Sequence, residues 1–138
     1  MIHHKATKDT KDTKNKGLVV SHKAIGAAIE VHRHLGPGLL ESVYEAALCR
    51  ELWLRRIAFE QQVPVRIEYK GLGLRTAVRL DLLVEQCVVV EVKAVEQLLP
   101  IHRSQLLTYL KVTGHQVGLL INFNVHLLRS GMRRLLVG

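Results

Sequence analysis

Two hydrophobic runs of the sequence contain charged residues at a spacing that suits metal-assisted hydrolysis. Residues 79–83 contain Asp81, and residues 88–93 contain Glu91 and Lys93. Alternate residues of a strand point to the same face, so Glu91 and Lys93 would lie side by side. A buried acid is costly unless another group compensates its charge. Two acids on neighbouring strands, with a lysine beside them, can bind a hard divalent cation and orient the water that the cation activates.

These residues also allow a structural interpretation. Glu91 and Lys93 would form an ordinary ion pair if their strand face were solvated, and such a pair adds little stability. A third acid, Glu41, lies on the flank of an apolar stripe in a predicted helix. A glutamate in the first turn of a helix is also favourable simply because it faces the positive end of the helix dipole. Both interpretations stay open on these residues alone.

Length and composition predict one folded domain. The 138 residues are enough for one hydrophobic core, and 48% of them are hydrophobic. The formal net charge of +8 favours an anionic partner, and nucleic acid is the commonest such partner of a cytosolic protein. No apolar run approaches the roughly 20 residues of a membrane span, and the apolar segment of a secretory signal is missing at the start. We therefore expect a cytoplasmic protein without membrane contact.

The first part of the chain is predicted to be a disordered basic tail followed by two helices. Residues 7–15 repeat a Thr-Lys-Asp pattern without a hydrophobic group, so we expect residues 1–16 to be disordered and residues 17–138 to form the domain. A helix over residues 22–35 would have Ser21 as its N-cap. A second helix is predicted over residues 39–56 because apolar residues recur there at helical spacing.

Three strands are predicted next. Residues 57–69 and 75–84 are expected to be strands joined by a hairpin turn over residues 70–73. Pro64 indicates an edge position or a strand entry for the first of them. Residues 87–93 form the third strand, and their unbroken valines indicate burial on both faces near the centre of the sheet.

The last part of the chain is predicted to contain a helix over residues 100–113, which Gly114 closes, and a strand over residues 117–123. A short terminal strand could follow over residues 132–137. Gln105 and Tyr109 are four residues apart and share one face of the helix, where they either support the site or form an ordinary core-facing pair. The order of elements predicts an α/β fold with a central mixed sheet flanked by helices.

The motif Gly38-x-x-Glu41-x-x-Tyr44 resembles the GxxExxY pattern of a family of small bacterial proteins, themselves similar to the PD-(D/E)XK nuclease superfamily. The resemblance covers residues 20–138. It extends to an ordered set of further stretches, which is more specific than one motif. These stretches are Glu30-Val31-His32, Leu35-Gly36-Pro37-Gly38, Tyr69-Lys70-Gly71, Asp81-Leu82-Leu83-Val84, Glu91-Val92-Lys93-Ala94, Gln105-Leu106-Leu107-Thr108-Tyr109-Leu110 and Gly118-Leu119-Leu120-Ile121-Asn122-Phe123.

The resemblance implies a restriction-endonuclease-like core with a metal-dependent nuclease site. Asp81 and Glu91 would bind Mg²⁺, for which Mn²⁺ could substitute, and Lys93 would orient or activate the attacking water. Glu41 is similar to the additional acid that many members of the superfamily carry. Phosphodiester cleavage needs a Lewis acid, a nucleophile near neutral pH and stabilisation of the leaving oxygen, and these residues would supply all three.

The resemblance has further implications and two departures. Gln105 and Tyr109 match a QxxxY helix that supports the site or contacts substrate in the exonuclease-like branch. Leu80 stands where the name of the superfamily has a proline, and Arg56 stands where a glycine would be expected to end the second helix. Nucleases of the superfamily often pair to cut both strands, so a homodimer is compatible with the resemblance.

Two functions from different classes follow. The first is a magnesium-dependent nuclease that hydrolyses phosphodiester bonds in DNA or RNA. The second is a non-catalytic nucleic-acid or protein interaction module that retains the nuclease fold. The intact set of Asp81, Glu91 and Lys93 favours the nuclease, because a binding module does not need all three residues.

Overall fold

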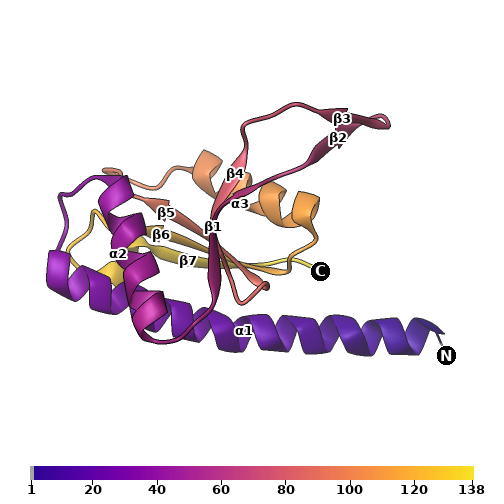
Figure 1. The fold of residues 1–138 in the computed structure, drawn as a ribbon, viewed down its shortest axis with the longest axis horizontal. Coiled ribbons are helices and arrows are strands. Elements are labelled where there is room, and N and C mark those ends of the chain that lie inside the picture. The colour runs from indigo at the N-terminus through magenta and orange to yellow at the C-terminus, as the bar shows by residue number, and fades with distance from the viewer. Residues whose placement is uncertain (1) are drawn as a thin grey trace.

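The fold is built on a mixed five-stranded sheet with helices on both faces, as the sequence predicted (Figure 1). The computed structural model describes the backbone of residues 2–138 and the side chains of residues 11–138. The strand order is β1-β4-β5-β6-β7, in which only the β5–β6 pair is parallel. The strands are β1 (Phe59–Pro64), β4 (Arg79–Val84), β5 (Val88–Lys93), β6 (Val117–Asn122) and β7 (Met132–Leu136).

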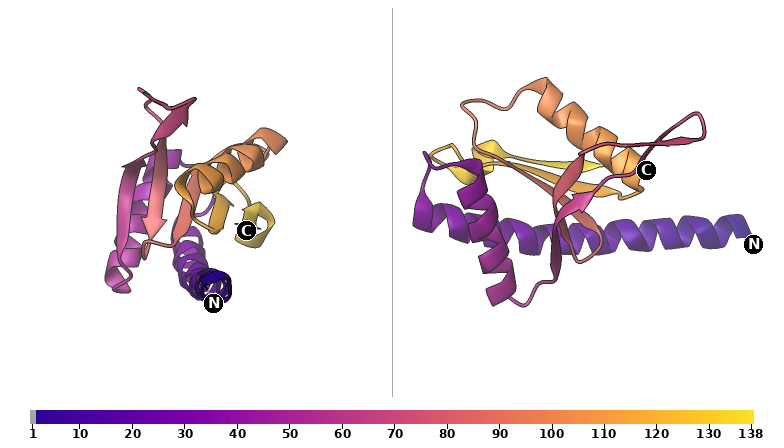
Figure 2. Two further views of the ribbon diagram at one scale, coloured as in Figure 1. Left: turned by 90° about the vertical axis from the view of Figure 1, so that its right-hand side faces the viewer. Right: turned by 45° about the horizontal axis from the view of Figure 1, so that its top comes forward.

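The three helices cover opposite faces of this sheet (Figure 2). One core cluster joins α1 (Ile2–Leu35) and α2 (Glu41–Leu54) to the alternate valines Val88, Val90 and Val92 of β5. The other cluster joins α3 (Pro100–Thr113) to the opposite face of the same strand, where Val89 lies. The central strand β5 is therefore buried on both sides, which confirms the interpretation of its valines. No helix within residues 2–138 is long and apolar enough to cross a membrane.

Several predicted boundaries are confirmed. The helix α3 spans Pro100–Thr113, and Gly114 ends it in the left-handed conformation with φ 78°. The proline-containing strand β1 lies at an edge of the sheet, where its missing N–H costs no ladder bond. A short 3₁₀ helix, η1 (Leu128–Gly131), precedes the terminal strand β7.

The predicted continuous strand over residues 57–69 is wrong, because this segment forms two separate strands. After β1 the chain leaves the sheet and forms β2 (Ile67–Tyr69), which pairs only with β3 (Leu72–Leu74) in a separate two-stranded sheet. The pairing of β1 with β4 ends at Pro64 and Arg79, and one further backbone bond, from the N–H of Val65 to the carbonyl of Val78, closes the base of the hairpin. The turn lies at Lys70 and Gly71, within the predicted range 70–73, but the second half of that range belongs to β3. The predicted strand over residues 75–84 is also too long, because residues 75–78 are not a strand and β4 begins at Arg79.

The first helix is longer than predicted. The structure continues α1 back to Ile2, whereas the sequence predicted a disordered tail over residues 1–16, of which Met1 lies outside the described residues. Ser21 is not an N-cap, because the helix runs through it and its hydroxyl donates to the carbonyl of Leu18 at 2.7 Å. Near the predicted boundary, Lys14 Nζ donates to the carbonyl of Gly138 at 2.9 Å. The division of the chain at residue 16 stays a prediction.

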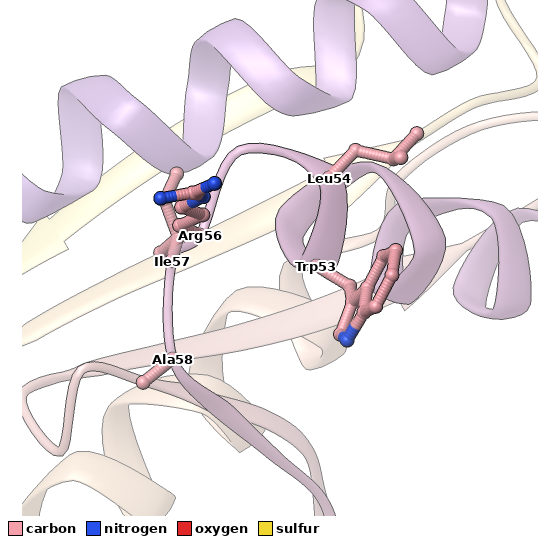
Figure 3. Close-up of a pocket in the computed structure, with 5 residues that line it drawn as sticks. All are labelled: Trp53, Leu54, Arg56, Ile57 and Ala58. Atoms are coloured by element: carbon pink, nitrogen blue, oxygen red, sulfur yellow. The ribbon is translucent and has the colours of Figure 1, made fainter.

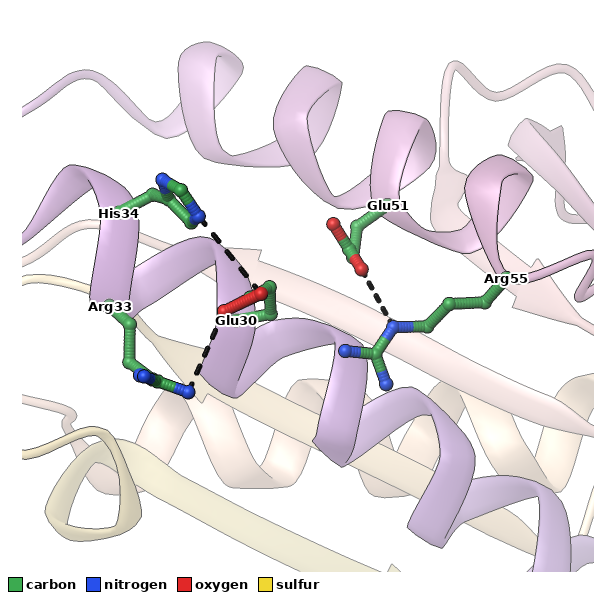
Figure 4. Close-up of polar contacts among 5 residues, drawn as sticks. All are labelled: Glu30, Arg33, His34, Glu51 and Arg55. Atoms are coloured by element: carbon green, nitrogen blue, oxygen red, sulfur yellow. Dashed lines mark hydrogen bonds and ion pairs between the residues drawn. The ribbon is translucent and has the colours of Figure 1, made fainter.

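The helices α1 and α2 approach closely at Gly26. A Cβ atom added at this glycine would lie 3.3 Å from Nη1 of Arg55, so the small residue makes room for the guanidinium. The same Arg55 forms a 2.7 Å ion pair with Glu51, and Glu30 lies within 3.8 Å of Arg33 on the neighbouring helix (Figure 4). Both pairs are local, one within α1 and the other at the end of α2, so neither links the two helices. Apolar contacts in one core cluster hold α1 and α2 together.

The end of α2 has a non-glycine residue in a backbone conformation that favours glycine. Arg56, in the position where a glycine was expected, adopts the left-handed conformation with φ 59°. Its N–H donates to the carbonyl of Trp53, and the N–H of Ile57 donates to the carbonyl of Leu52. This is the hydrogen-bond pattern of a helix end that glycine normally closes. Arg56 itself lines an open surface hollow of about 560 Å³ beside the exposed Trp53 (Figure 3).

We expect Arg56→Gly to stabilise the protein by about 0.5–1 kcal/mol, because glycine adopts the left-handed conformation without a steric penalty. Arg50→Gly is the matched control, since Arg50 lies within α2. That change should destabilise the protein by about 1 kcal/mol. Urea unfolding of both variants measures the difference, and destabilisation by both would contradict this account of the helix end.

Candidate active site

Asp81 and Glu91 are joined by an exchange of hydrogen bonds between β4 and β5. The register of the two strands, in which Leu82 lies opposite Val90, places Asp81 opposite Glu91. The N–H of Asp81 donates to Oε2 of Glu91 at 2.8 Å, and the N–H of Val92 donates to Oδ2 of Asp81 at 2.8 Å. Two side-chain oxygens thus take the place of backbone carbonyls, and the regular pairing ends there. The bonds fix both carboxyl groups at one end of the sheet.

The two carboxyl groups share a poorly solvated environment. Glu91 is only 5% exposed, and burial, followed by the negative charge of Asp81, raises its pKa to about 8. Burial also raises the pKa of Asp81, against the effect of the N–H of Val92. The two carboxyl groups interact directly, and this contact adds to the rise in the pKa of Glu91 and opposes the rise in that of Asp81.

Lys93 and Glu41 lie near this pair. The positive charge of Lys93 lowers the pKa of Glu91, Asp81 and Glu41, so its ammonium group acts on all three acids. Burial is the main cause that raises the pKa of Glu41. Lys93 opposes this rise, and the negative charges of Asp81 and Glu45 add to it. The structure therefore brings together the four charged residues that the sequence singled out.

The predicted pair on α3 reaches the same place from the other face of the sheet. Burial raises the pKa of Tyr109, and the charges of Glu91 and Asp81 raise it further. A side-chain hydrogen bond with Gln105 lowers it, which shows that the two α3 residues contact each other. His102, on the same helix, instead accepts the N–H of Leu99 at 3.0 Å through Nδ1 and so caps the start of α3.

A model of one protein family matches this chain over residues 19–135. The chain belongs to the PD-(D/E)XK nuclease superfamily. The matched range includes both carboxylates, and Glu91-Val92-Lys93 has the form of the (D/E)XK part of the name. No curated protein and no solved structure matched the chain.

The candidate site also contains a buried acid that the sequence did not reveal. Glu45 is 9% exposed and accepts hydrogen bonds through Oε2 from the side-chain amides of Gln61 at 2.7 Å and Gln62 at 2.9 Å. The amide of Gln62 also lies 3.5 Å from Oδ1 of Asp81. Glu45 follows Glu41 by four residues on α2, so helical spacing could have placed it on the same face. Glu41, Glu45, Gln62 and Asp81 line an open hollow of about 520 Å³.

A second missed residue, Asn122, fixes the chain that follows Lys93. It lies opposite Lys93 in the parallel pairing of β5 and β6, and it is 2% exposed. Its amide oxygen accepts the N–H of Val95 at 3.0 Å, and its amide nitrogen donates to the carbonyl of Val95 at 2.9 Å. A polar residue at the end of an otherwise apolar strand was the available signal. Its hydrogen-bond partner depends on the tertiary structure.

The tyrosine of the motif around Glu41 holds the loop that precedes this acid. The hydroxyl of Tyr44 donates to the carbonyl of Gly36 at 2.5 Å and accepts the N–H of Leu39 at 3.1 Å. Its ring stacks on Phe123 with the centroids 4.7 Å apart. Gly38, at φ 102°, provides the backbone conformation that the loop requires. The motif thereby sets the start of α2, where Glu41 lies.

The described side chains do not form a complete metal cage. Within residues 11–138, no group of three or more His, Cys, Asp or Glu side chains is arranged to hold a metal ion. Asp81 and Glu91 are the carboxylate pair that lies in contact.

The free energy of unfolding should fall as the pH rises from about 4.5 to about 8, because Glu91 is buried. The pKa of Glu91 is about 8 in the folded chain, against 4.5 as the ordinary value. Between these values the unfolded chain loses a proton that the folded chain retains, so ionisation favours unfolding. Without divalent cations, Glu91→Gln should therefore stabilise the protein at pH 8, on the order of 2–4 kcal/mol, and change it little at pH 4.

Urea unfolding at pH 4, 6 and 8 in the presence of a chelator tests this expectation. Glu68→Gln is the matched control, because Glu68 is exposed on the β2–β3 hairpin and should leave the pH dependence unchanged. If Glu91→Gln keeps the native pH dependence of stability, ionisation of Glu91 is not what destabilises the folded chain.

Proposed function

We propose that this chain is a divalent-metal-dependent nuclease that hydrolyses phosphodiester bonds in nucleic acid, with Mg²⁺ or Mn²⁺ bound by Asp81 and Glu91. The observation that carries the proposal is the contact between these two carboxyl groups beside Lys93. Membership of the nuclease superfamily and the net charge of +8 support a nucleic-acid substrate. We also propose a cytoplasmic location and, from residues 38–44, a place in the GxxExxY group.

The chemistry of the donor set fits a hard divalent cation. Both ligands are carboxylates, and each is already oriented by a backbone N–H bond to one of its oxygens. Burial and the negative charge of Asp81 raise the pKa of Glu91 to about 8, and a divalent cation would displace the proton of Glu91 and compensate both negative charges. Magnesium retains several waters and needs few protein ligands, so a two-carboxylate site is sufficient for it.

When bound, the cation would stabilise negative charge on the phosphate and lower the pKa of a coordinated water. Lys93 would orient the attacking water and stabilise the charge that develops on the phosphate oxygens. Glu41, at the hollow between α2 and β4, would accept a hydrogen bond or a proton from that water. Gln105 and Tyr109 would support the two carboxylates or contact the substrate from α3.

The alternative is a binding module that retains the fold without cleaving. It predicts the same basic surface and the same affinity for nucleic acid, but no role for Lys93 in turnover. The two adjacent carboxyl groups favour the enzyme, because their burial costs stability that a binding module does not need to lose.

The test is cleavage of labelled single-stranded and double-stranded DNA and RNA by the full chain with Mg²⁺ or Mn²⁺. Lys93→Ala should lower the cleavage rate by about 100-fold or more, because it removes charge stabilisation in the transition state. Lys23→Ala, at an exposed position of α1, is the matched control and should cleave like the native chain. Chelator should abolish cleavage by every variant.

Two results would contradict the proposal. If the native chain binds nucleic acid but cleaves none of the four substrates with either metal, the binding module is the better account. If cleavage survives in Lys93→Ala purified in the same way, the activity comes from another site or from a contaminant.

A further inference from the structure

The β2–β3 hairpin is an arm that projects from the sheet (Figures 1 and 2). Its two strands pair only with each other, with Ile67 opposite Leu74 and Tyr69 opposite Leu72. Lys70 and Gly71 form the turn with φ 48° and φ 85°. Two successive positive φ angles give the mirror-image turn whose twist matches that of the flanking strands, so the arm has a defined shape.

One face of the arm is apolar, with Ile67 half-buried against the core at the base and the rest of the face exposed. Ile67, Tyr69, Leu72 and Leu74 share this face, because they are cross-strand pairs two residues apart along each strand. Tyr69 is 61% exposed, Leu72 is 66% exposed and Leu74 is 43% exposed. The folding of this chain does not require three large apolar side chains in solvent on one short ribbon. Such a patch is typical of a surface that contacts a partner.

The arm and its base are strongly basic. Four basic residues against the single acid Glu68 give residues 66–79 a net charge of +3, that is, four minus one. Arg66 pairs with Glu68 at 3.4 Å, and Lys70 holds its ammonium 5.3 Å from the ring centroid of Tyr69. A second copy of the chain would bring like charges together, whereas a polyanion would neutralise them. The basic residues are Arg66, Lys70, Arg75 and Arg79.

The base of the arm adjoins the candidate active site. Arg79 precedes Asp81 by two residues on β4, and its Nη1 donates to the carbonyl of Gln62 at 3.3 Å. The amide of Gln62 in turn bonds Glu45, which lines the hollow next to Asp81. A polyanion held along the arm would therefore pass close to the two carboxylates.

We propose that the β2–β3 arm binds double-stranded DNA by entering its major groove, which deepens, and rests on, the nuclease function proposed above. The major groove of B-form DNA admits a two-stranded ribbon, and apolar side chains such as Leu72 contact thymine methyl groups there. Lys70 at the tip and Arg75 nearer the base contact phosphates on the two sides of the groove. The major groove of an RNA duplex is too narrow for side chains to read, so the arm selects DNA.

The test measures binding of a labelled 20-base-pair DNA duplex to the full chain by fluorescence anisotropy, with chelator present so that cleavage does not interfere. Lys70→Glu should weaken binding by roughly tenfold and reduce its salt dependence, because a phosphate contact is lost. Lys23→Glu makes the same charge change at an exposed site on α1 and should weaken binding by less than about twofold. Leu72→Ser should weaken duplex binding while the melting temperature stays unchanged, since Leu72 is exposed.

Four outcomes would contradict the proposal that the arm binds duplex DNA. They are no duplex binding by the native chain, equal losses in Lys70→Glu and Lys23→Glu, equal affinity for single-stranded DNA or duplex RNA, and a native dimer that Leu72→Ser dissociates without weakening duplex binding. Failure of the nuclease is separate from failure of the arm. If duplex binding depends on Lys70 but the chain never cleaves, the DNA-binding role of the arm is supported and the nuclease proposal is rejected. If Lys70→Glu binds and cleaves like the native chain, only the role of the arm is rejected.

Discussion

The candidate site depends on two carboxylates that stand in for backbone carbonyls between β4 and β5. The carboxylates of Asp81 and Glu91 each accept a backbone N–H of the opposite strand. Neither carboxylate can move away without leaving that N–H without its partner. The exchange also ends the regular pairing and leaves the two carboxyl groups close together in a poorly solvated place, where the pKa of Glu91 rises to about 8. The sheet thereby holds the two carboxylates in fixed positions, which a flexible loop would not do.

The surrounding elements hold the other residues around this pair. On one side, Tyr44 fixes the loop before Glu41 and stacks on Phe123. On the other side, Asn122 holds Val95, two residues beyond Lys93. Since Asn122 and Phe123 are neighbours at the end of β6, the supports of the acid on α2 and of the lysine on β5 meet at one point of the chain. A change at this point should affect both sides of the site.

The sequence predicts the parts of this arrangement that depend on local pattern. Charged residues inside apolar strands pointed to Asp81, Glu91 and Lys93, and Pro100 and Gly114 marked the ends of α3. Glu45 and Asn122 were missed because their importance lies in partners that are distant in sequence, namely Gln61 and Gln62 for the first and Val95 for the second. The departure of β2 from the sheet was missed for the same reason, since periodicity does not specify which strand a segment pairs with.

The most direct test of the paired carboxylates is the number of protons released when Mg²⁺ binds. Calorimetric titration of the full chain at pH 7, in two buffers of different ionisation enthalpy, measures both binding and proton release. The account predicts release of up to about one proton per cation, because the cation replaces the proton that Glu91 holds with its pKa of about 8. Asp81→Asn should abolish binding. Magnesium binding without proton release, or binding that Asp81→Asn leaves unchanged, would contradict the central claim that this pair is the metal site.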